Sequence, residues 1–189
     1  NNTFYQCSSL ETVSIPNSVT SIGEYAFQSC TSLETVSIPS SVTSIDDEAF
    51  SQCDNLATLI LDTPLLGLTN GFVATYFGDS QTKITSVTVG DSVTMIEEKA
   101  FYECTSLKSL TIGSNVTEIA EYAASGCTNL EILDIGDSVA IIGQDVFSFC
   151  SKLQSVTLPG SVATIGGSAF HSCSELRTLT VPNGVTSIG

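Results

Sequence analysis

The sequence predicts a repeat solenoid, mainly β, whose coil of about 23 residues falls in the range typical of such folds. The first observation is that seven cysteines recur at one constant interval, with a single longer gap between Cys53 and Cys104. They are Cys7, Cys30, Cys53, Cys104, Cys127, Cys150 and Cys173. The second is that apolar residues recur in the same register around each cysteine. Self-similarity at a fixed period is typical of solenoids, in which each coil contacts only its neighbours.

The extended part of each coil follows the cysteine. In residues 10–16, Val13 and Ile15 alternate with Thr12 and Ser14, which indicates a half-buried strand. Proline ends the strand where no backbone donor is needed, and glycine takes the same place as a turn residue. The prolines are Pro16, Pro39, Pro159 and Pro182, and the glycines are Gly90, Gly113 and Gly136.

The rest of the coil is a second short extended segment and a turn. In residues 19–22, the β-branched first and last residues are expected to point inward. Residues 23–30 then bring Ala26, Phe27 and Cys30 inward, which favours a single helical or 3-10 turn. One coil cannot bury this apolar face alone, whereas a stack of coils buries it in a shared core.

We expect the cysteines to form a buried column of free thiols. Their number is odd, and no Cys-x-x-Cys pair suits zinc. Each cysteine lies between an apolar Phe or Ala and an apolar Leu, where a free thiol behaves as a small hydrophobic group. A disulfide between neighbouring coils stays open as an alternative. No metal site and no cofactor are predicted.

The repeated phrase resembles a known family. One copy comprises Ala26, Phe27, Cys30, Leu33, Val36 and Ile38, followed by Pro39. This phrase runs through nearly the whole chain, outside residues 63–83, and resembles the BspA-like class of leucine-rich repeat. The resemblance implies a right-handed superhelix whose strands form a parallel sheet. It also implies a surface or secreted protein with a role in adhesion and protein binding, and no shared catalytic motif.

Residues 63–83 interrupt what we expect to be a single array over residues 1–189. They lack the cysteine and the second extended segment, and they are rich in turn residues and aromatics. We expect a degenerate coil with an insertion that loops or bulges from the solenoid. Phe72 and Phe77 are expected to replace the missing core Phe, and Tyr76 to be exposed. Because neither end carries a distinct cap, we expect the array to be a fragment of a longer protein.

The outward residues of the strands form two columns of hydroxyl side chains. With Tyr76, they are the predicted binding residues: Thr12, Ser14, Thr35, Ser37, Ser86, Thr88, Ser109, Thr111, Ser155, Thr157, Thr178 and Thr180. One interpretation is purely structural, because Ser and Thr suit exposed strand positions. Another is a face that binds protein or glycan. A third is ice binding, which the interruptions at Ile132 and Asp134 disfavour.

The charge of the chain is strongly acidic. Twenty Asp and Glu face five Lys and Arg, for a net charge of −15. This surface repels phosphate groups, so nucleic acid and anionic membranes are poor partners. No stretch approaches the ~18 apolar residues that span a bilayer, so no membrane insertion is predicted.

No catalytic group stands out in the sequence. His171 is the only histidine, and its variable place in the repeat argues against a Ser–His–Asp site. We therefore expect a non-catalytic interaction or adhesion module, extracellular or on the cell surface, and not an enzyme. The alternative is a structural spacer that holds another domain away from a surface.

Overall fold

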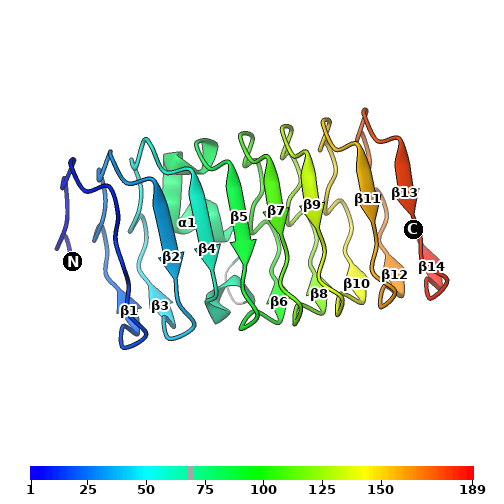
Figure 1. Ribbon diagram of the computed structural model, residues 1–189, viewed down its shortest axis with the longest axis horizontal. Helices are drawn as coiled ribbons and strands as arrows, with labels where there is room; N and C mark the ends of the chain where they lie inside the picture. Colours follow the sequence, from blue (N-terminus) through cyan, green and yellow to red (C-terminus); the bar gives the residue numbers. More distant parts are fainter. Residues whose placement is uncertain (68–69) are drawn as a thin grey trace.

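The computed structural model describes residues 1–67 and 70–189, and they form a β-solenoid whose coils stack along one axis (Figure 1). The two termini lie at opposite ends of the stack. Each regular coil supplies one strand to a first parallel sheet and a two-residue strand to a second. The predicted fold class is confirmed.

The first sheet contains the strands that the alternating pattern predicts. Its strands are parallel and in chain order: β2 (Thr35–Ile38), β4 (Thr58–Leu61), β5 (Ser86–Val89), β7 (Ser109–Thr111) and β9 (Ile132–Asp134). β11 (Ser155–Thr157) and β13 (Thr178–Thr180) pair with each other. Thr35 lies opposite Thr58, and Thr58 lies opposite Ser86. The coil between β4 and β5 is therefore longer than the coil between β2 and β4.

The second sheet comes from the Val-x-x-Ile segments and is interrupted at that longer coil. β1 (Ser21–Ile22) pairs with β3 (Ser44–Ile45), and a separate run contains β6 (Met95–Ile96), β8 (Glu118–Ile119), β10 (Ile141–Ile142), β12 (Thr164–Ile165) and β14 (Ser187–Ile188). Between the two runs lies a 3-10 helix, η1 (Pro64–Gly67). In β1, β3, β6, β8, β10 and β12 the last residue is buried, which supplies one isoleucine per coil to the core.

The regular turn before each cysteine is not the helical or 3-10 turn that we expected. In residues 23–30, Ala26 donates its backbone N–H to Gly23 and Cys30 donates to Phe27, each across three residues. Tyr25 and Ser29, the third residue of each of these turns, have φ values of 54° and 59°. A positive φ at that place is typical of type II turns and stops a right-handed helix from forming.

The core contains a stack of phenylalanine rings and a column of thiols. The ring centroids of Phe27 and Phe50 lie 5.1 Å apart with planes inclined by 2°. The thiol of Cys53 donates to the carbonyl oxygen of Phe27, 3.3 Å away in the preceding coil. The buried column is confirmed for Cys30, Cys53, Cys104, Cys127, Cys150 and Cys173, and all seven cysteines are free.

Cys7 departs from the predicted column. Its side chain is exposed, whereas the other six cysteines are buried. Each buried cysteine has a preceding coil to pack against, whereas Cys7 lies in the first coil of this chain. The expectation of burial was therefore wrong at this one position.

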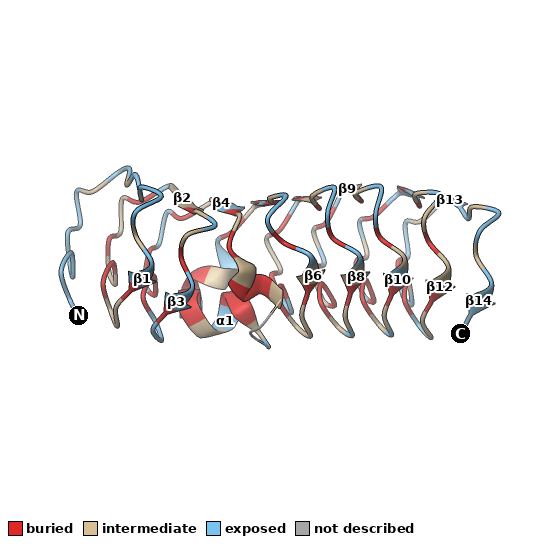
Figure 2. Cartoon of the chain, turned by 90° about the horizontal axis from the view of Figure 1, so that it is seen from below, coloured by how far each residue is buried: buried red, intermediate tan, exposed pale blue. Residues whose placement is uncertain are grey.

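The segment 63–83 is part of the stack, so the expectation that it bulges away was wrong. It forms η1, the helix α1 (Phe72–Phe77) and the 3-10 helix η2 (Gly78–Thr82), and only residues 68–69 of it lie outside the described part. The backbone N–H of Phe50 donates to Tyr76 at 2.9 Å, and that of Val73 donates to Ala100 at 3.0 Å. These bonds join α1 to the coils on both sides, and Figure 2 shows the helix between β3 and β6.

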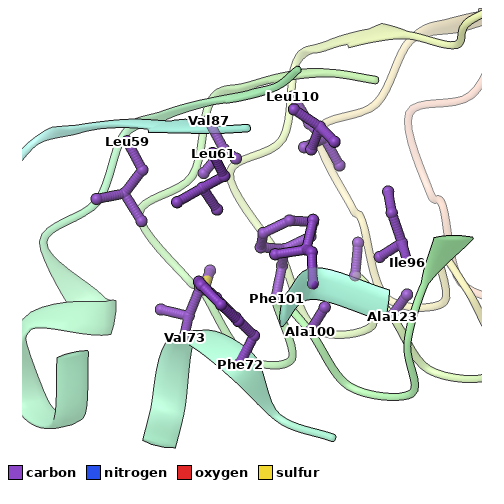
Figure 3. Close-up of a cluster of buried hydrophobic side chains, with 14 of the residues drawn as sticks. Leu59, Leu61, Phe72, Val73, Val87, Ile96, Ala100, Phe101, Leu110 and Ala123 are labelled. Atoms are coloured by element: carbon purple, nitrogen blue, oxygen red, sulfur yellow. The ribbon is translucent and has the colours of Figure 1, made fainter. Parts of the chain in front are cut away.

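The aromatic residues of α1 complete the core. Phe77 stacks on Phe50 with centroids 5.1 Å apart, and both Phe72 and Phe77 are fully buried, as predicted. Figure 3 shows Phe72 and Val73 in the same apolar cluster as Leu61 and Phe101. The insertion thus lengthens one coil without opening the core.

Candidate binding surfaces

The predicted hydroxyl residues do stack in register on the outer side of the first sheet. In the first column, Thr35 pairs with Thr12 and Thr58, Ser86 pairs with Thr58 and Ser109, and Ser155 pairs with Thr178. In the second column, Thr88 pairs with Thr111, Thr157 pairs with Thr180, and Ser37 pairs with Ile60. We call the outer side of the first sheet and of the adjoining pair β11 and β13, with these two columns, the sheet face.

Every predicted residue of the sheet face is accessible to some degree. The fully exposed ones are Thr12, Ser14, Thr88, Ser155, Thr157, Thr178 and Thr180. The half-buried ones are Thr35, Ser37, Ser86, Ser109 and Thr111. The hydroxyl side chains therefore meet solvent along the whole array.

Two isoleucines interrupt the hydroxyl columns. Ile60 is 40% exposed and Ile132 is 61% exposed. Asp134 adds a carboxylate next to Ile132, at the edge strand β9, where the sheet ends before β11. The face is thus polar overall, with two apolar side chains and one charge along it.

Tyr76 is not on the sheet face, and its predicted exposure was wrong. Its side chain is only 7% exposed. Phe72 and Tyr76 lie four residues apart in α1, so they share one side of the helix, and their rings meet edge to face at 5.1 Å. That side faces the core, so Tyr76 cannot act as the exposed aromatic anchor that we expected.

A second candidate surface lies on the edge formed by the turns, and sequence analysis missed it. It is an open groove of about 460 Å³ whose lining includes Tyr102, Glu103, Tyr122, Gly126, Asp145 and Phe149. We call it the turn groove. Its signal in the sequence is a coil with small residues, Ala124-Ser125-Gly126, where another coil has Phe27-Gln28-Ser29.

The walls of the turn groove are aromatic and acidic. Phe149 is 52% exposed, and its ring meets that of His171 edge to face at 5.5 Å. The hydrogen bond with Glu103 and the charge of that carboxylate raise the pKa of Tyr102 above its ordinary value. The amide of Gln144 donates to the Tyr122 hydroxyl at 3.4 Å and to the Asp145 carboxylate at 3.1 Å.

The buried thiols are not activated for catalysis. Burial is the main cause that raises the pKa of Cys53 and of Cys104 to about 12. A catalytic or metal-binding cysteine needs the opposite, a lowered pKa in a partly exposed site. Across residues 1–67 and 70–189, no group of three or more His, Cys, Asp or Glu residues is placed to hold a metal ion.

None of the helices in the described residues is long and apolar enough to cross a membrane.

The comparison with protein families assigns the repeat. The family model described as "BspA type Leucine rich repeat region" matches residues 1–72 and 73–189, in six copies. The chain belongs to the BspA-type leucine-rich repeat family. A search among curated proteins finds no match.

Solved structures similar to this leucine-rich repeat chain come from bacteria. A leucine rich cell surface protein from Faecalibacterium prausnitzii A2-165 is 28% identical with a TM-score of 0.55, covering 96% of this chain and 50% of that one. The T. pallidum Leucine Rich Repeat protein is 26% identical with a TM-score of 0.57, covering 82% and 68%. A leucine-rich repeat protein from Eubacterium ventriosum ATCC 27560, at 23% identity and a TM-score of 0.51, shares the fold. The chain thus spans half the length of the first of these proteins.

Proposed function

We propose that this leucine-rich repeat array is a non-catalytic protein-interaction module of a surface or secreted protein, and that it binds through the sheet face. The observation that carries the proposal is the pair of in-register hydroxyl columns, with exposed Ile60 and Ile132 among them. Support for the location comes from the similar Faecalibacterium protein, which is described as a cell surface protein.

The geometry of the sheet face suits a rigid protein partner. Parallel strands repeat every ~4.8 Å, so the hydroxyl groups form an ordered array whose side chains lose little freedom on binding. Protein interfaces concentrate their binding energy in a few buried side chains within a polar rim. Ile132 and Ile60 have the exposure that such central contacts require.

The charge of the array adds a preference for basic partners. The net charge of −15 attracts cationic surfaces at long range and speeds encounter at low ionic strength. We therefore expect binding to weaken as salt concentration rises.

The experiment compares two substitutions of exposed isoleucines. Ile132→Asp lies on the sheet face, and Ile141→Asp lies on β10 of the second sheet with 40% exposure. Both add the same charge to an exposed strand position. Binding of the intact array to a panel of immobilised extracellular-matrix proteins is measured by surface plasmon resonance, after circular dichroism shows that both variants are folded.

The proposal expects Ile132→Asp to reduce affinity about tenfold or more, as for a central contact, and Ile141→Asp to leave it unchanged. Equal loss in both variants would remove the sheet face as the site. If binding to a glycosylated protein disappears after enzymatic deglycosylation, the ligand is the glycan and not the protein. Absence of binding to every member of the panel would favour the spacer role.

A further inference from the structure

We propose that the turn groove binds the cationic side chain, lysine or arginine, of a basic peptide segment. The residues that line the turn groove include none of the sheet-face residues, so this inference stands apart from the proposed function. It rests on the shape of the groove, on its aromatic walls and on its unbalanced negative charge.

The shape of the turn groove arises from one coil whose turn residues are small. In the turn slot of Gly126, other coils carry Gln6, Ser29, Gln52, Glu103, Phe149 and Ser172, each with positive φ. Gly126 has a φ of 78°, and a Cβ there would lie 3.2 Å from the Cγ of Glu103. Ser125 is buried beside it, where its hydroxyl meets that of Ser148 at 2.8 Å. These small residues leave a hollow between the two flanking coils.

The walls of the hollow carry aromatic rings from the central coil and from the coil on each side of it. Tyr102 belongs to the preceding coil and Phe149 to the following one, and both are exposed. Tyr122 closes the groove within the central coil. Aromatic rings attract ammonium and guanidinium groups through their electron-rich faces, more strongly when the site is sheltered from water.

The charge around the groove is negative and lacks a cationic partner inside. Glu103 and Asp145 line it on opposite sides, and its lining contains no lysine or arginine. Lys99 forms an ion pair with Glu98, and neither of these residues lines the groove. Two carboxylates beside three aromatic rings match a cation on an alkyl stem better than they match an uncharged sugar.

The chain already shows this type of contact next to the groove. The Lys99 ammonium lies 5.8 Å from the centroid of the Tyr122 ring. Lys99, Tyr122 and Asp145 occupy the same position of the turn in three successive coils. A lysine from a partner would meet the same ring with a carboxylate beside it.

The test uses a fluorescein-labelled peptide of alternating glycine and lysine, with a copy whose lysines are acetylated as the uncharged control. Fluorescence anisotropy at low salt measures its affinity for the intact array. Two variants change the groove without changing net charge: Gly126→Gln fills the hollow with the residue found at Gln6 and Gln52, and Phe149→Ser removes a wall. Matched controls on the same edge are Ser29→Gln and Tyr5→Ser.

A further pair separates the groove from general attraction to an acidic protein. Asp145→Asn and Asp137→Asn each remove one negative charge, but only the first lies in the groove. We expect each groove variant to weaken the affinity for the lysine peptide about fivefold or more, as for cation–π contacts in a partly sheltered site. Each control should change this affinity less than about twofold.

Three outcomes overturn the proposal. Equal losses in groove and control variants would show that the peptide binds the acidic surface at large. Unchanged binding of the acetylated peptide would show that the cation is irrelevant. Competition by cellohexaose, with losses in the groove variants, would assign the groove to a saccharide. Amide chemical-shift changes confined to residues 99–105, 122–128 and 145–149 on peptide addition would support the proposal directly.

Discussion

The Cys127 thiol donates to the carbonyl oxygen of Phe101 in the preceding coil, 3.2 Å away. The same bond recurs from Cys30, Cys53 and Cys173 to Phe4, Phe27 and Phe147. These four thiols therefore do more than fill space, because each also donates to a backbone acceptor of the preceding coil. This explains why the slot holds Cys in place of Ala.

Replacing a thiol of the buried column tests its contribution to stability. Cys127→Ala removes the donor and leaves a small cavity, so we expect a loss of about 1–2 kcal/mol in the free energy of unfolding. Chemical denaturation monitored by circular dichroism measures it. Cys7→Ala is the control, since that thiol is exposed, and should change stability by less than about 0.5 kcal/mol. A similar loss in both variants would contradict the role of burial.

Thiol ionisation gives a dependence of stability on alkaline pH. Burial raises the pKa of Cys53 and Cys104 from 9.0 to about 12. Between these values the unfolded chain releases thiol protons that the folded chain keeps, so the free energy of unfolding should fall from about pH 9 to about pH 12. Below about pH 9 the contribution is fully present.

Denaturation curves across this pH range measure the slope. A Cys53→Ala, Cys104→Ala double variant should show a shallower decline than the natural chain. The idea fails if the slope is the same in both. Iodoacetamide at about pH 8.5 should meanwhile modify Cys7 in the folded protein and all seven thiols only after unfolding.

The phenylalanine stack tests whether the irregular coil belongs to the core. Phe50→Ala and Phe77→Ala should each cost about 3–5 kcal/mol, because both rings are fully buried and stacked. Phe4→Ala should cost clearly less, since its ring is partly exposed and has one stacking partner. If Phe77→Ala proved as mild as Phe4→Ala, the residues around α1 would not be integral to the stack.

Glycine at the end of α1 has a backbone requirement. Gly78 has φ of 49° and ψ of −130°, which only glycine adopts without strain, and a Cβ there would lie 3.2 Å from that of Ser51. Gly78→Ala should therefore cost about 1–3 kcal/mol in thermal or chemical unfolding. Gly160→Ala, at a glycine with no close neighbours and no positive φ, is the control and should be nearly neutral.

The converse substitution should stabilise the array. Ser168 is exposed with a φ of 58°, a conformation that costs a residue with a Cβ about 1 kcal/mol relative to glycine. Ser168→Gly should raise the unfolding free energy by a few tenths to about 1 kcal/mol. Ser168→Val should lower it. A higher unfolding free energy in both Ser168→Gly and Ser168→Val would contradict the positive φ of Ser168.

Much of the fold could be predicted because the same apolar residue types recur at each core position in coil after coil. Val36 and Leu59 point inward as the alternation with Thr35 and Thr58 required, and the sheet face followed from the same register. The regular turn was mispredicted. Tyr25 and Ser29 have positive φ values in turns that are closed by backbone hydrogen bonds, and neither residue is a glycine or asparagine that would have indicated such a turn in the sequence.

The other failures at Tyr76 and at the turn groove lie where the sequence departs from its own repeat. Tyr76 could not be placed without knowing that α1 exists and which of its sides meets Phe72. The turn groove was missed because it depends on the missing side chain at Gly126. It also depends on Tyr102 and Phe149, which come together only when the coils stack. The binding roles of the sheet-face residues stay predictions.

The long coil at η1 has a mechanical consequence for the whole array. There the second sheet lacks its ladder, and the hydroxyl of Thr63 reaches the carbonyl oxygen of Val42 at 2.8 Å in its place. In a chain of units that cooperate through their neighbours, order propagates across a junction as long as enough bonds cross it. The first sheet runs unbroken from β2 to β9 across this coil, so under pulling or heat the coils on either side of it should unfold together.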